Sequence, residues 1–383
     1  MANVLGNFSP IFYAQEGLIQ LWEAMGMARR VHMGFDRERA TFKKGSIISI
    51  KRPSDFTVQD APGTAEDIDV DTVDITLDQW KTVKFKLSDK EYAYTGQNII
   101  DEHIIPAALR LANQIDLDLN GLYSDIPWYH DLAAAGTEAD VVDTMKIAFD
   151  NKVPTEDMAN MHFEVSSAMH ASLLKQDAFT SHQGSGDVGV AAQIRGQIAQ
   201  RYGCNFFANQ NVPTHTKGTS GTTAVLTNGA IVKGATSVNL DAGTLIGTVV
   251  PGDVFSIAGQ TQQYAVTNSV TASGNAMAAV TFTPPLTADV SDGTSVTLEL
   301  DTHTANMLFH KNAFALAFAK LPDLKNFDNQ LGAQVASVQD PRTGLALRAR
   351  VYYVGDDSEI HVALDALYGK KTLDPNLAVR ARG

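Results

Sequence analysis

The sequence has almost no cysteine and no long apolar run. Cys204 is the only cysteine among 383 residues, so no disulfide can form within the chain, and a reducing compartment is the simplest setting. Residues 1–10 lack the basic start and apolar run of a secretory signal, and no segment approaches the roughly 18–20 apolar residues that span a bilayer. We therefore expect a protein that is made in the cytosol and has no membrane partner.

Basic side chains are also scarce. The chain has 30 Lys and Arg against 43 Asp and Glu, which gives a formal net charge of -13. Non-specific nucleic-acid affinity comes from clustered Lys and Arg that displace counterions from phosphates. These numbers exclude such affinity as a property of the whole chain and leave room only for a local basic face.

Charge of either sign nearly disappears between Gly218 and Leu300. Only six charged side chains occur there, and no arginine lies between Arg201 and Arg342. Thr, Gly, Ala, Val and Ser dominate, and short β-like runs are separated by Gly and Pro. This block is typical of a compact all-β module inserted into a host domain of different composition.

The strongest helical signal in the host covers residues 98–124. Asn98 is a candidate N-cap, and Pro106 should either kink the helix or mark its start. A helix of about 25 residues would be close to 40 Å long, enough for the spine of a domain. The apolar residues that recur at spacings of three and four are Ile100, Ile104, Ala108, Leu111, Ile115, Leu119 and Leu122.

Shorter patterns predict the other elements of the host, which make it an α+β protein. Helices are expected over residues 11–27, 140–150 (behind a capping box from Thr137 to Asp140), 187–202 (ended by Gly203) and 311–320. Strands are expected over residues 163–165, 306–310 and 345–353. Two of these helices have apolar residues along one face. In the helix over 11–27 they are Leu18, Ile19, Trp22 and Met25, and this face needs a surface to cover it. In the helix over 187–202 they are Val190, Ile194 and Ile198.

Residues 41–94 change to a period of two. Ile48 and Ile50 alternate with polar residues, and Val83, Phe85 and Leu87 alternate with lysines. The pattern predicts a long two-stranded β-arm. Because a lone hairpin is at best marginally stable in water, we expect this arm to be clamped against another surface of the same chain or of a neighbouring copy.

Two motifs could bind ligands, and each has a structural interpretation that we favour. Gly184-Ser-Gly186-Asp-Val-Gly189 matches a dinucleotide fingerprint, but the preceding residues 167–179 are helical in pattern, so a flexible glycine loop is expected. Four aspartates could collect around Ca²⁺, but they lack the EF-hand spacing and more simply form an acidic face: Asp67, Asp69, Asp71 and Asp74. The basic residues that could pair with this face are Arg29, Arg30, Arg37, Arg39, Lys43, Lys44, Lys51 and Arg52.

Catalytic patterns are missing from the sequence. His215, His303 and His310 lie near the ends of the charge-poor block and are expected to be ordinary structural side chains. No G-x-S-x-G elbow or H-E-x-x-H pair occurs, and Cys204 lacks the context of a nucleophile. We expect no enzyme and no catalytic, cofactor or metal site, and instead a protein whose function is shape and contact.

Three separated groups of motifs give a more specific indication. They are Asn209–Thr219, Gly252–Gly259 with Gln262–Thr267, and Asp365–Gly369 with Pro375–Arg380. Together they resemble the major coat proteins of tailed bacteriophages of the P-twenty-two type. The resemblance runs in element order over about residues 10–380 and implies a Hong Kong 97-like capsid fold with an inserted β-domain.

The resemblance also implies a domain organisation and a set of partners. The segments would be an N-terminal arm (1–40), an extended β-loop (41–94), a peripheral domain (95–170) with the spine helix 98–124, the first part of an axial domain (171–215), the inserted β-domain (216–302) and an axial and peripheral return (303–383). Hexamers and pentamers would form an icosahedral shell around double-stranded DNA, assembled in the host bacterial cytoplasm and retained in the virion. The implied partners are a scaffolding protein, a portal at one vertex and, as a further candidate, a decoration protein.

Particular residues take roles under this interpretation. Gly45 and Gly96 would be hinges of the extended loop, where Lys81, Lys84 and Lys86 would be candidates for cross-links. The residues best suited to non-specific DNA contact on the inner face would be Arg29, Arg30, Arg37 and Arg39. Two alternatives remain: another self-assembling phage protein such as a tail tube subunit, and an enzyme with a carbohydrate-binding β-module.

Overall fold

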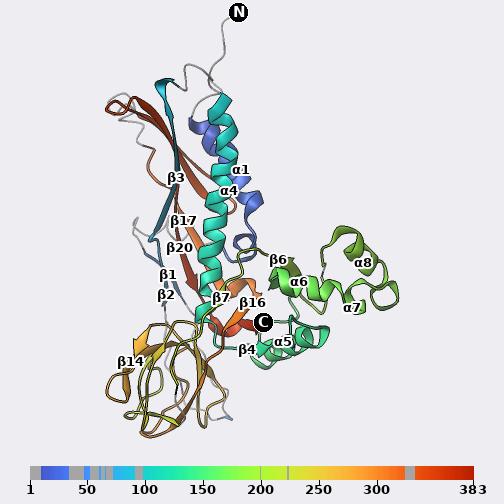
Figure 1. Cartoon of the computed structure of the whole chain (residues 1–383), viewed down its shortest axis with the longest axis vertical. Coiled ribbons are helices and arrows are strands. Elements are labelled where there is room, and N and C mark those ends of the chain that lie inside the picture. Colours follow the sequence, from blue (N-terminus) through green and yellow to red (C-terminus); the bar gives the residue numbers. More distant parts are fainter. Residues whose placement is uncertain are drawn as a thin grey trace, which may run out of the picture. The chain divides into compact units, whose positions relative to one another are not determined.

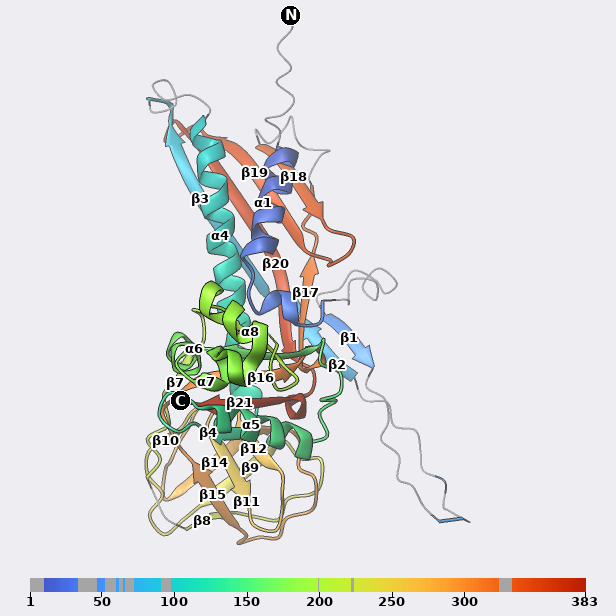
Figure 2. The ribbon, with the colours of Figure 1, turned by 90° about the vertical axis from the view of Figure 1, so that its right-hand side faces the viewer.

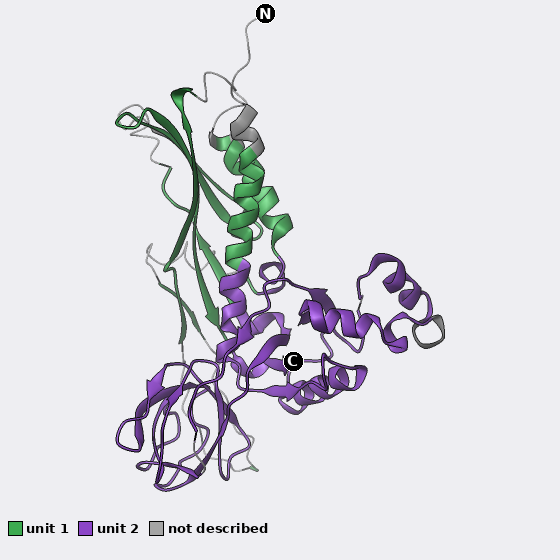
Figure 3. Ribbon diagram, viewed as in Figure 1, with its two compact units in different colours: residues 1–25, 32–115, 315–373 green, residues 26–31, 116–314, 374–383 purple. Residues whose placement is uncertain are grey.

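The computed structural model describes residues 10–33, 47–51, 60–61, 65, 72–90, 98–198, 200–221, 224–323 and 333–383. The chain is a mixed α+β protein, as expected, and it forms two compact units (Figure 1, Figure 3). Unit 1 contains Met1–Met25, His32–Ile115 and Ala315–Leu373, and unit 2 contains Gly26–Val31, Asp116–Phe314 and Asp374–Gly383. Residues 116–170 belong to unit 2.

Unit 1 is built on a five-stranded sheet. Its longest strand, β20 (Glu359–Thr372), pairs with β19 (Ala346–Val354), β3 (Gln79–Ser88) and β17 (Phe314–Ala319), and β18 (Ala333–Gln339) pairs with β19. The prediction of a strand over residues 345–353 is confirmed by β19. Strand β3 pairs with β20 from Ser88 opposite Glu359 to Gln79 opposite Tyr368. Residues 79–88, which we had assigned to the extended loop, are therefore part of this sheet.

The helix predicted over residues 311–320 is wrong. A short 3-10 turn, η4 (Lys311–Ala313), leads directly into strand β17. All six residues of β17, Phe-Ala-Leu-Ala-Phe-Ala, are buried. A short apolar run that is buried on both faces shows neither helical nor alternating periodicity. The sequence pattern alone therefore could not distinguish a buried strand from a helix here.

Helix α1 (Pro10–Ala24) packs on β18 and β19 (Figure 2). The apolar stripe that we predicted for it is only partly correct, because Met25 is buried but Ile19 is 54% exposed. Small residues form much of the actual contact. Ala14 is completely buried, and a Cβ added at Gly17 would lie 2.9 Å from Leu347 Cδ2, so the glycine allows a close approach of helix and sheet.

The long helix is confirmed as α4 (Asn98–Asn120), followed by the 3-10 helix η3 (Gly121–Asp125). Pro106 lies inside α4, so it does not mark the start of the helix. The predicted apolar face is the buried face: Ile104, Ala108, Leu111, Ile115, Leu119 and Leu122 are each at most 9% exposed. This match shows that the spacing of apolar residues determines how α4 is oriented.

Besides β3, the described residues of the predicted β-arm contain two short strands. They are β1 (Ile47–Lys51) and β2 (Thr72–Thr76), which pair in antiparallel register with Ile48 opposite Ile75. Both isoleucines are buried in a cluster with Leu77, Ala315, Ala317 and Ala319. The base of the arm is thus packed on the fully buried strand β17 of its own chain.

Unit 2 contains a second sheet, the C-terminal end of α4 and, among its described residues, four further α-helices. The sheet order is β4 (Tyr129–Asp131), β21 (Ala378–Arg382), β16 (His303–His310), β5 (Met161–Val165) and β6 (Asn205–Ala208), and β7 (Thr214–His215) also pairs with β16. The helices are α5 (Glu138–Asp150), α6 (Ser167–Leu174), α7 (Asp177–Thr180) and α8 (His182–Arg195). The strands predicted at 163–165 and 306–310 are confirmed by β5 and β16.

The predicted start of α5 is confirmed, whereas the predicted end of α8 is wrong. The capping box before α5 is confirmed, because Asp140 Oδ2 accepts from the Thr137 backbone N–H at 2.6 Å and Thr137 Oγ1 accepts from Asp140 N–H at 3.4 Å. Helix α8 ends at Arg195 and is followed by Gly196 with φ of 63°. Gly203 is therefore not its stop.

The charge-poor block forms a closed six-stranded barrel, which confirms the all-β prediction. The strands in order around the barrel are β11 (Val254–Ile257), β12 (Gln263–Val266), β14 (Ala276–Thr283), β9 (Ser237–Asp241), β8 (Val225–Thr227) and β15 (Ser295–Glu299). The same block also contains a small antiparallel pair, β10 (Thr248–Val249) and β13 (Val270–Thr271). Phe255, Tyr264 and Phe282 form the aromatic centre of its core, with ring centroids 5.1–5.5 Å apart.

None of the helices in the described ranges is long and apolar enough to cross a membrane.

We predict that Gly369→Ala destabilises the chain by about 1–3 kcal/mol, as overpacking of a dense contact usually does. A Cβ at Gly369 in β20 would lie 2.3 Å from the backbone carbonyl oxygen of Thr76 in β2. Gly355→Ala is the matched control, because no atom lies within 4 Å of its added Cβ. Urea unfolding measures both variants, and equal midpoints for the two would contradict the close approach of β2 and β20.

Candidate functional site: a buried junction between the barrel and the sheet of unit 2

Five polar side chains meet where the barrel joins the rest of unit 2, and we call this cluster the barrel junction. It consists of Tyr123, His215, Asp253, His303 and Arg380. All except Tyr123 are at most 4% exposed. His215, Asp253 and Arg380 each come from a different one of the three motif groups in the sequence, so the structure brings those distant motifs together.

A chain of hydrogen bonds crosses the junction. Tyr123 Oη lies 3.1 Å from His215 Nδ1, and His215 Nε2 lies 3.0 Å from Asp253 Oδ1. Because a carboxylate can only accept, His215 Nε2 carries the proton and Nδ1 accepts from the tyrosine hydroxyl. Burial raises the pKa of Tyr123, which keeps this hydroxyl protonated as the donor.

Asp253 also holds the backbone that enters the barrel. Its Oδ2 accepts from Val250 N–H at 2.8 Å, and both of its carboxylate oxygens lie 3.2 Å from the nitrogen of Gly218. A Cβ at Gly218 would lie 2.3 Å from the carbonyl oxygen of Thr248 and 2.5 Å from Asp253 Oδ2. Glycine is therefore required for the chain to approach this carboxylate.

Arg380 supplies the positive charge of the junction from strand β21. It is completely buried, and its Nη1 donates to the carbonyl oxygen of Gly252 at 2.8 Å. Burial lowers the pKa of Arg380 to about 10, so it remains a cation at neutral pH, and the nearby Asp253 favours that charge. Arg380 thus ties the sheet to the barrel through the backbone carbonyl next to Asp253, and its Nε and Nη2 have no hydrogen-bond partner among the described residues.

His303 completes the junction as a neutral ring. Its centroid lies 5.1 Å from that of His215, and its Nδ1 donates to the carbonyl oxygen of Asp301 at 3.0 Å. Burial and the nearby Arg380 lower the pKa of His303 to about 3. His303 therefore packs against His215 without adding charge.

The hydrogen-bonded Tyr, His and Asp could relay a proton in an open cleft. Here the side chains of His215 and Asp253 are only 3% and 1% exposed, so a substrate cannot reach them. A buried carboxylate that binds two backbone amides and one imidazole fixes geometry. The arrangement suits the attachment of the barrel in one orientation.

Sequence reasoning found this site only in part. It placed His215 and His303 near the ends of the charge-poor block and predicted a structural role, but it did not single out Tyr123, Asp253 or Arg380. A signal was present, because Asp253 is one of only six charged side chains in that block. His310 lies apart from the junction, with its Nε2 3.4 Å from Asp157 Oδ2.

The glycine motif and the four aspartates are the other candidate ligand sites. The glycine motif lies within α8 after the helices α6 and α7, and Gly186 interrupts the helix with φ of 58°. Asp74 is exposed on β2, whereas Asp67, Asp69 and Asp71 lie outside the described residues. No group of three or more His, Cys, Asp or Glu among the described residues could hold a metal ion. Burial raises the pKa of Cys204 to about 12, which keeps it a thiol.

Several residues to which the resemblance assigns roles make contacts with other side chains of the same chain. Arg30 is one of them, because its guanidinium lies 3.9 Å from the centroid of the Phe207 ring. Lys84 lies over the Tyr352 ring at 5.3 Å, and Lys86 Nζ lies 2.6 Å from Glu359 Oε1. Lys81, Lys84 and Lys86 are all on β3 in the sheet of unit 1 rather than in a loop. Arg29 is exposed, and Arg37, Arg39, Gly45 and Gly96 lie outside the described residues.

The fold is similar to that of phage proteins of known structure. The chain matches a chain of the structure "Mycobacterium phage Che8" with a TM-score of 0.51 and 15% identity, over 93% of this chain and 90% of that chain. Chains from "Capsid of native GTA particle computed with C5 symmetry" (TM-score 0.44, 10% identity, 88% and 85% covered) and from "Capsid structure of the Cyanophage P-SCSP1u" (0.42, 10%, 89% and 84%) also align. No protein-family model and no curated sequence matches. The first match shows a common fold.

We predict that Asp253→Ala lowers the free energy of unfolding by at least about 3 kcal/mol, because it leaves the buried His215 Nε2 and the backbone amides of Val250 and Gly218 without their acceptor. Urea unfolding of the purified chain measures the effect. Asp143→Ala on the exposed side of α5 removes the same charge from the same unit and should change stability by less than about 0.5 kcal/mol. Similar midpoints for the two variants would show that the junction does not hold the barrel.

Proposed function

We propose that the chain is a major capsid protein of a tailed bacteriophage, of the P-twenty-two type with a Hong Kong 97-like fold. Copies would assemble into hexamers and pentamers that form an icosahedral head shell around double-stranded DNA. The observation that carries the proposal is the fold match with a chain of Mycobacterium phage Che8, which covers both chains almost from end to end. The resemblance of the motifs to coat proteins supports the same conclusion from the sequence.

The convergence of those motifs strengthens the argument. His215, Asp253 and Arg380 lie in stretches chosen for their likeness to coat proteins, and they meet in one buried cluster. Residues brought together by a shared fold are more informative than the same number of scattered matches. Their meeting supports the proposal that the barrel is an inserted domain of such a coat protein.

Within this proposal, unit 1 corresponds to the peripheral domain with the spine helix α4, and unit 2 to the axial domain with the barrel. Residues 1–40 would be the N-terminal arm, and the extended loop would lie within residues 41–94 without strand β3. The partners would be a scaffolding protein, a portal and, as a further candidate, a decoration protein. Arg29, Arg37 and Arg39 remain proposed DNA contacts on the inner face. Arg30 is no longer proposed as one, because its guanidinium packs on the Phe207 ring.

Exposed apolar side chains on α8 fit a subunit that is covered by its copies. Val188, Val190 and Ile194 are 43%, 37% and 79% exposed. Single exposed apolar residues are common, but several on one helix indicate a contact surface. Because a shell repeats each heterologous contact by symmetry, even a small apolar surface contributes many times.

Imaging of the purified chain by negative-stain electron microscopy tests the proposal. Closed shells, or rings of five and six subunits, are expected. Open tubes would favour the alternative of a tail tube subunit. A compact single-copy particle at high concentration, with or without glycan binding, would contradict assembly and favour the enzyme alternative.

We predict that Ile194→Asp abolishes shell formation while the subunit remains folded. The charge would be buried in a contact between copies, where a charged group without a partner is costly. Sedimentation and imaging measure assembly, and circular dichroism with urea unfolding measures folding, where a surface change should cost less than about 0.5 kcal/mol. Gln193→Asp at the neighbouring exposed position is the control, and shells formed equally by both variants would show that this face of α8 makes no essential contact.

A further inference from the structure

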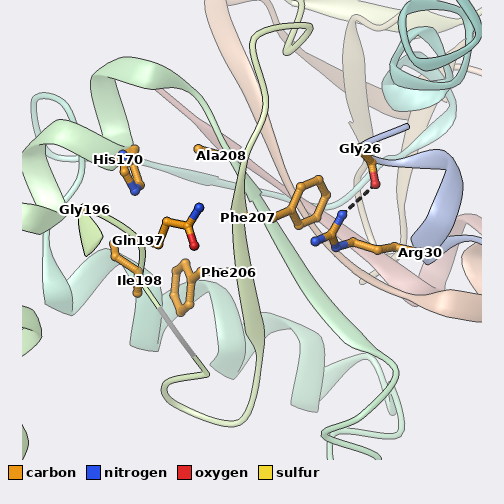
Figure 4. A pocket seen from close by; sticks show the side chains of 9 residues that line it. All are labelled: Gly26, Arg30, His170, Gly196, Gln197, Ile198, Phe206, Phe207 and Ala208. Atoms are coloured by element: carbon orange, nitrogen blue, oxygen red, sulfur yellow. Dashed lines mark hydrogen bonds between the residues drawn. The ribbon is translucent and has the colours of Figure 1, made fainter. Parts of the chain in front are cut away.

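A pocket lies beside strand β6, which ends the sheet of unit 2. Its volume is about 430 Å³, which is within the usual range of ligand-binding cavities. The apolar side chains that line it are those of Ile198, Phe206 and Phe207, and its polar lining includes Gln197 and Arg30 (Figure 4). The pocket is therefore large enough for a whole side chain of a binding partner.

The lining of this pocket suits an aromatic side chain. The guanidinium of Arg30 lies 3.9 Å from the centroid of the Phe207 ring, and its Nη1 donates to the carbonyl oxygen of Gly26 at 2.6 Å (Figure 4). These two contacts hold a cationic plane in the pocket wall. Aromatic rings stack on guanidinium planes and pack edge to face on other rings, so a phenyl group would find both kinds of partner here.

An exposed apolar helix face leads along the chain to the pocket. Ile194 is 79% exposed on the last turn of α8, and Val190 lies one turn earlier on the same face. Gly196 follows the helix directly and lines the pocket together with Gln197 and Ile198. We call the pocket and this face of α8 the socket.

The outer face of α5 carries a projecting aromatic ring. Phe149 is 69% exposed, more than any other aromatic side chain of the described residues. Val142 lies about two turns earlier on the same face and is 46% exposed. Asp143 and Asp150 follow these two residues in the chain and are exposed, whereas Lys146 is the only exposed cation of α5. We call this apolar face with its acidic border the knob.

The exposed charge next to the pocket is opposite to that of the knob. Arg195 is exposed at the end of α8, directly before the pocket residue Gly196, and the exposed Asp187 lies about two turns earlier on this helix. The carboxylate of Asp116 accepts from Gly26 N–H at 2.6 Å, but Asp116 is only 2% exposed and does not belong to the outer surface. Opposite charges on two surfaces favour their correct pairing.

Knob and socket lie toward different ends of one sheet. Helix α5 packs on β4 and β21, whereas the socket includes β6, and the strand order places β4 and β6 at the two ends. Two unlike surfaces on one subunit pair head to tail, and such a contact closes into a ring when its rotation allows. Every copy in a ring can then use both surfaces at once.

We propose that the Phe149 side chain of one copy enters the pocket of the next copy, with Asp150 beside Arg195. The contact covers the exposed faces of α5 and α8 and repeats around a ring of five or six subunits. This inference rests on the proposed function, because the occupant of the socket is a second copy of this chain in such a ring.

Photo-cross-linking of assembled particles tests the contact directly. The variant Phe149→p-benzoylphenylalanine keeps an aromatic side chain, and its ketone, when excited by light, joins to a C–H group that it touches. A denaturing gel should show adducts of two or more chains, and mass spectrometry should place the attachment at Gln197, Ile198, Phe206 or Phe207. The matched control is Val232→p-benzoylphenylalanine, at a 71% exposed residue of the charge-poor block, and should give no attachment at these residues.

Removal of the phenyl group gives a second measurement. Phe149→Ala should lower the yield of rings and shells by at least about tenfold, as loss of an aromatic anchor at an interface usually does. Phe149→Leu keeps an apolar side chain and should assemble better than Phe149→Ala, and Val232→Ala should assemble like the wild type. Because both positions are exposed in the single chain, the urea midpoints of all three variants should equal that of the wild type.

The outcomes separate this contact from the proposed function. Unchanged assembly of Phe149→Ala, or no attachment of the photoreactive side chain within the pocket, would overturn the contact and leave the proposed function in place. A wild type that forms neither rings nor shells would overturn both.

Discussion

The placement of the barrel depends on one buried carboxylate. Asp253 binds the imidazole of His215 and the backbone amides of Gly218 and Val250, and the carbonyl oxygen of the preceding Gly252 accepts from the buried Arg380 of the sheet in unit 2. A change in barrel orientation would separate these groups while they remain out of water, and each unpaired group would then carry its full desolvation cost. The junction therefore selects one orientation by making the others expensive.

Much of the fold could be predicted because local sequence patterns, namely apolar spacing, helix capping and composition, agreed with how the elements pack. The apolar spacing of α4, the capping box of α5 and the composition of the barrel each determined an element without distant information. Strand β17 and the buried face of helix α1 could not be predicted in this way. The first is buried on both faces, which removes periodicity, and the second uses Ala14 and Gly17 for contact, where close approach matters more than hydrophobicity.

The polar clusters were harder to predict because their members are distant in sequence. The junction joins Tyr123 to Arg380, and Glu164 has a chargeable side chain that predicts exposure although it is completely buried in β5. Only tertiary contacts distinguish a buried acid from an exposed one at such a position. The sequence did carry a weak signal for the junction, namely an isolated aspartate in a block that otherwise avoids charge.

The single cysteine has a practical consequence. A thiol reacts with maleimides and iodoacetamides as the thiolate, and Cys204 is buried with a pKa raised to about 12 by that burial. The folded protein should therefore behave toward these reagents like one without cysteine. A cysteine introduced at any exposed position would accept a fluorophore or spin label alone, so distances and assembly states could be followed without first removing a native thiol.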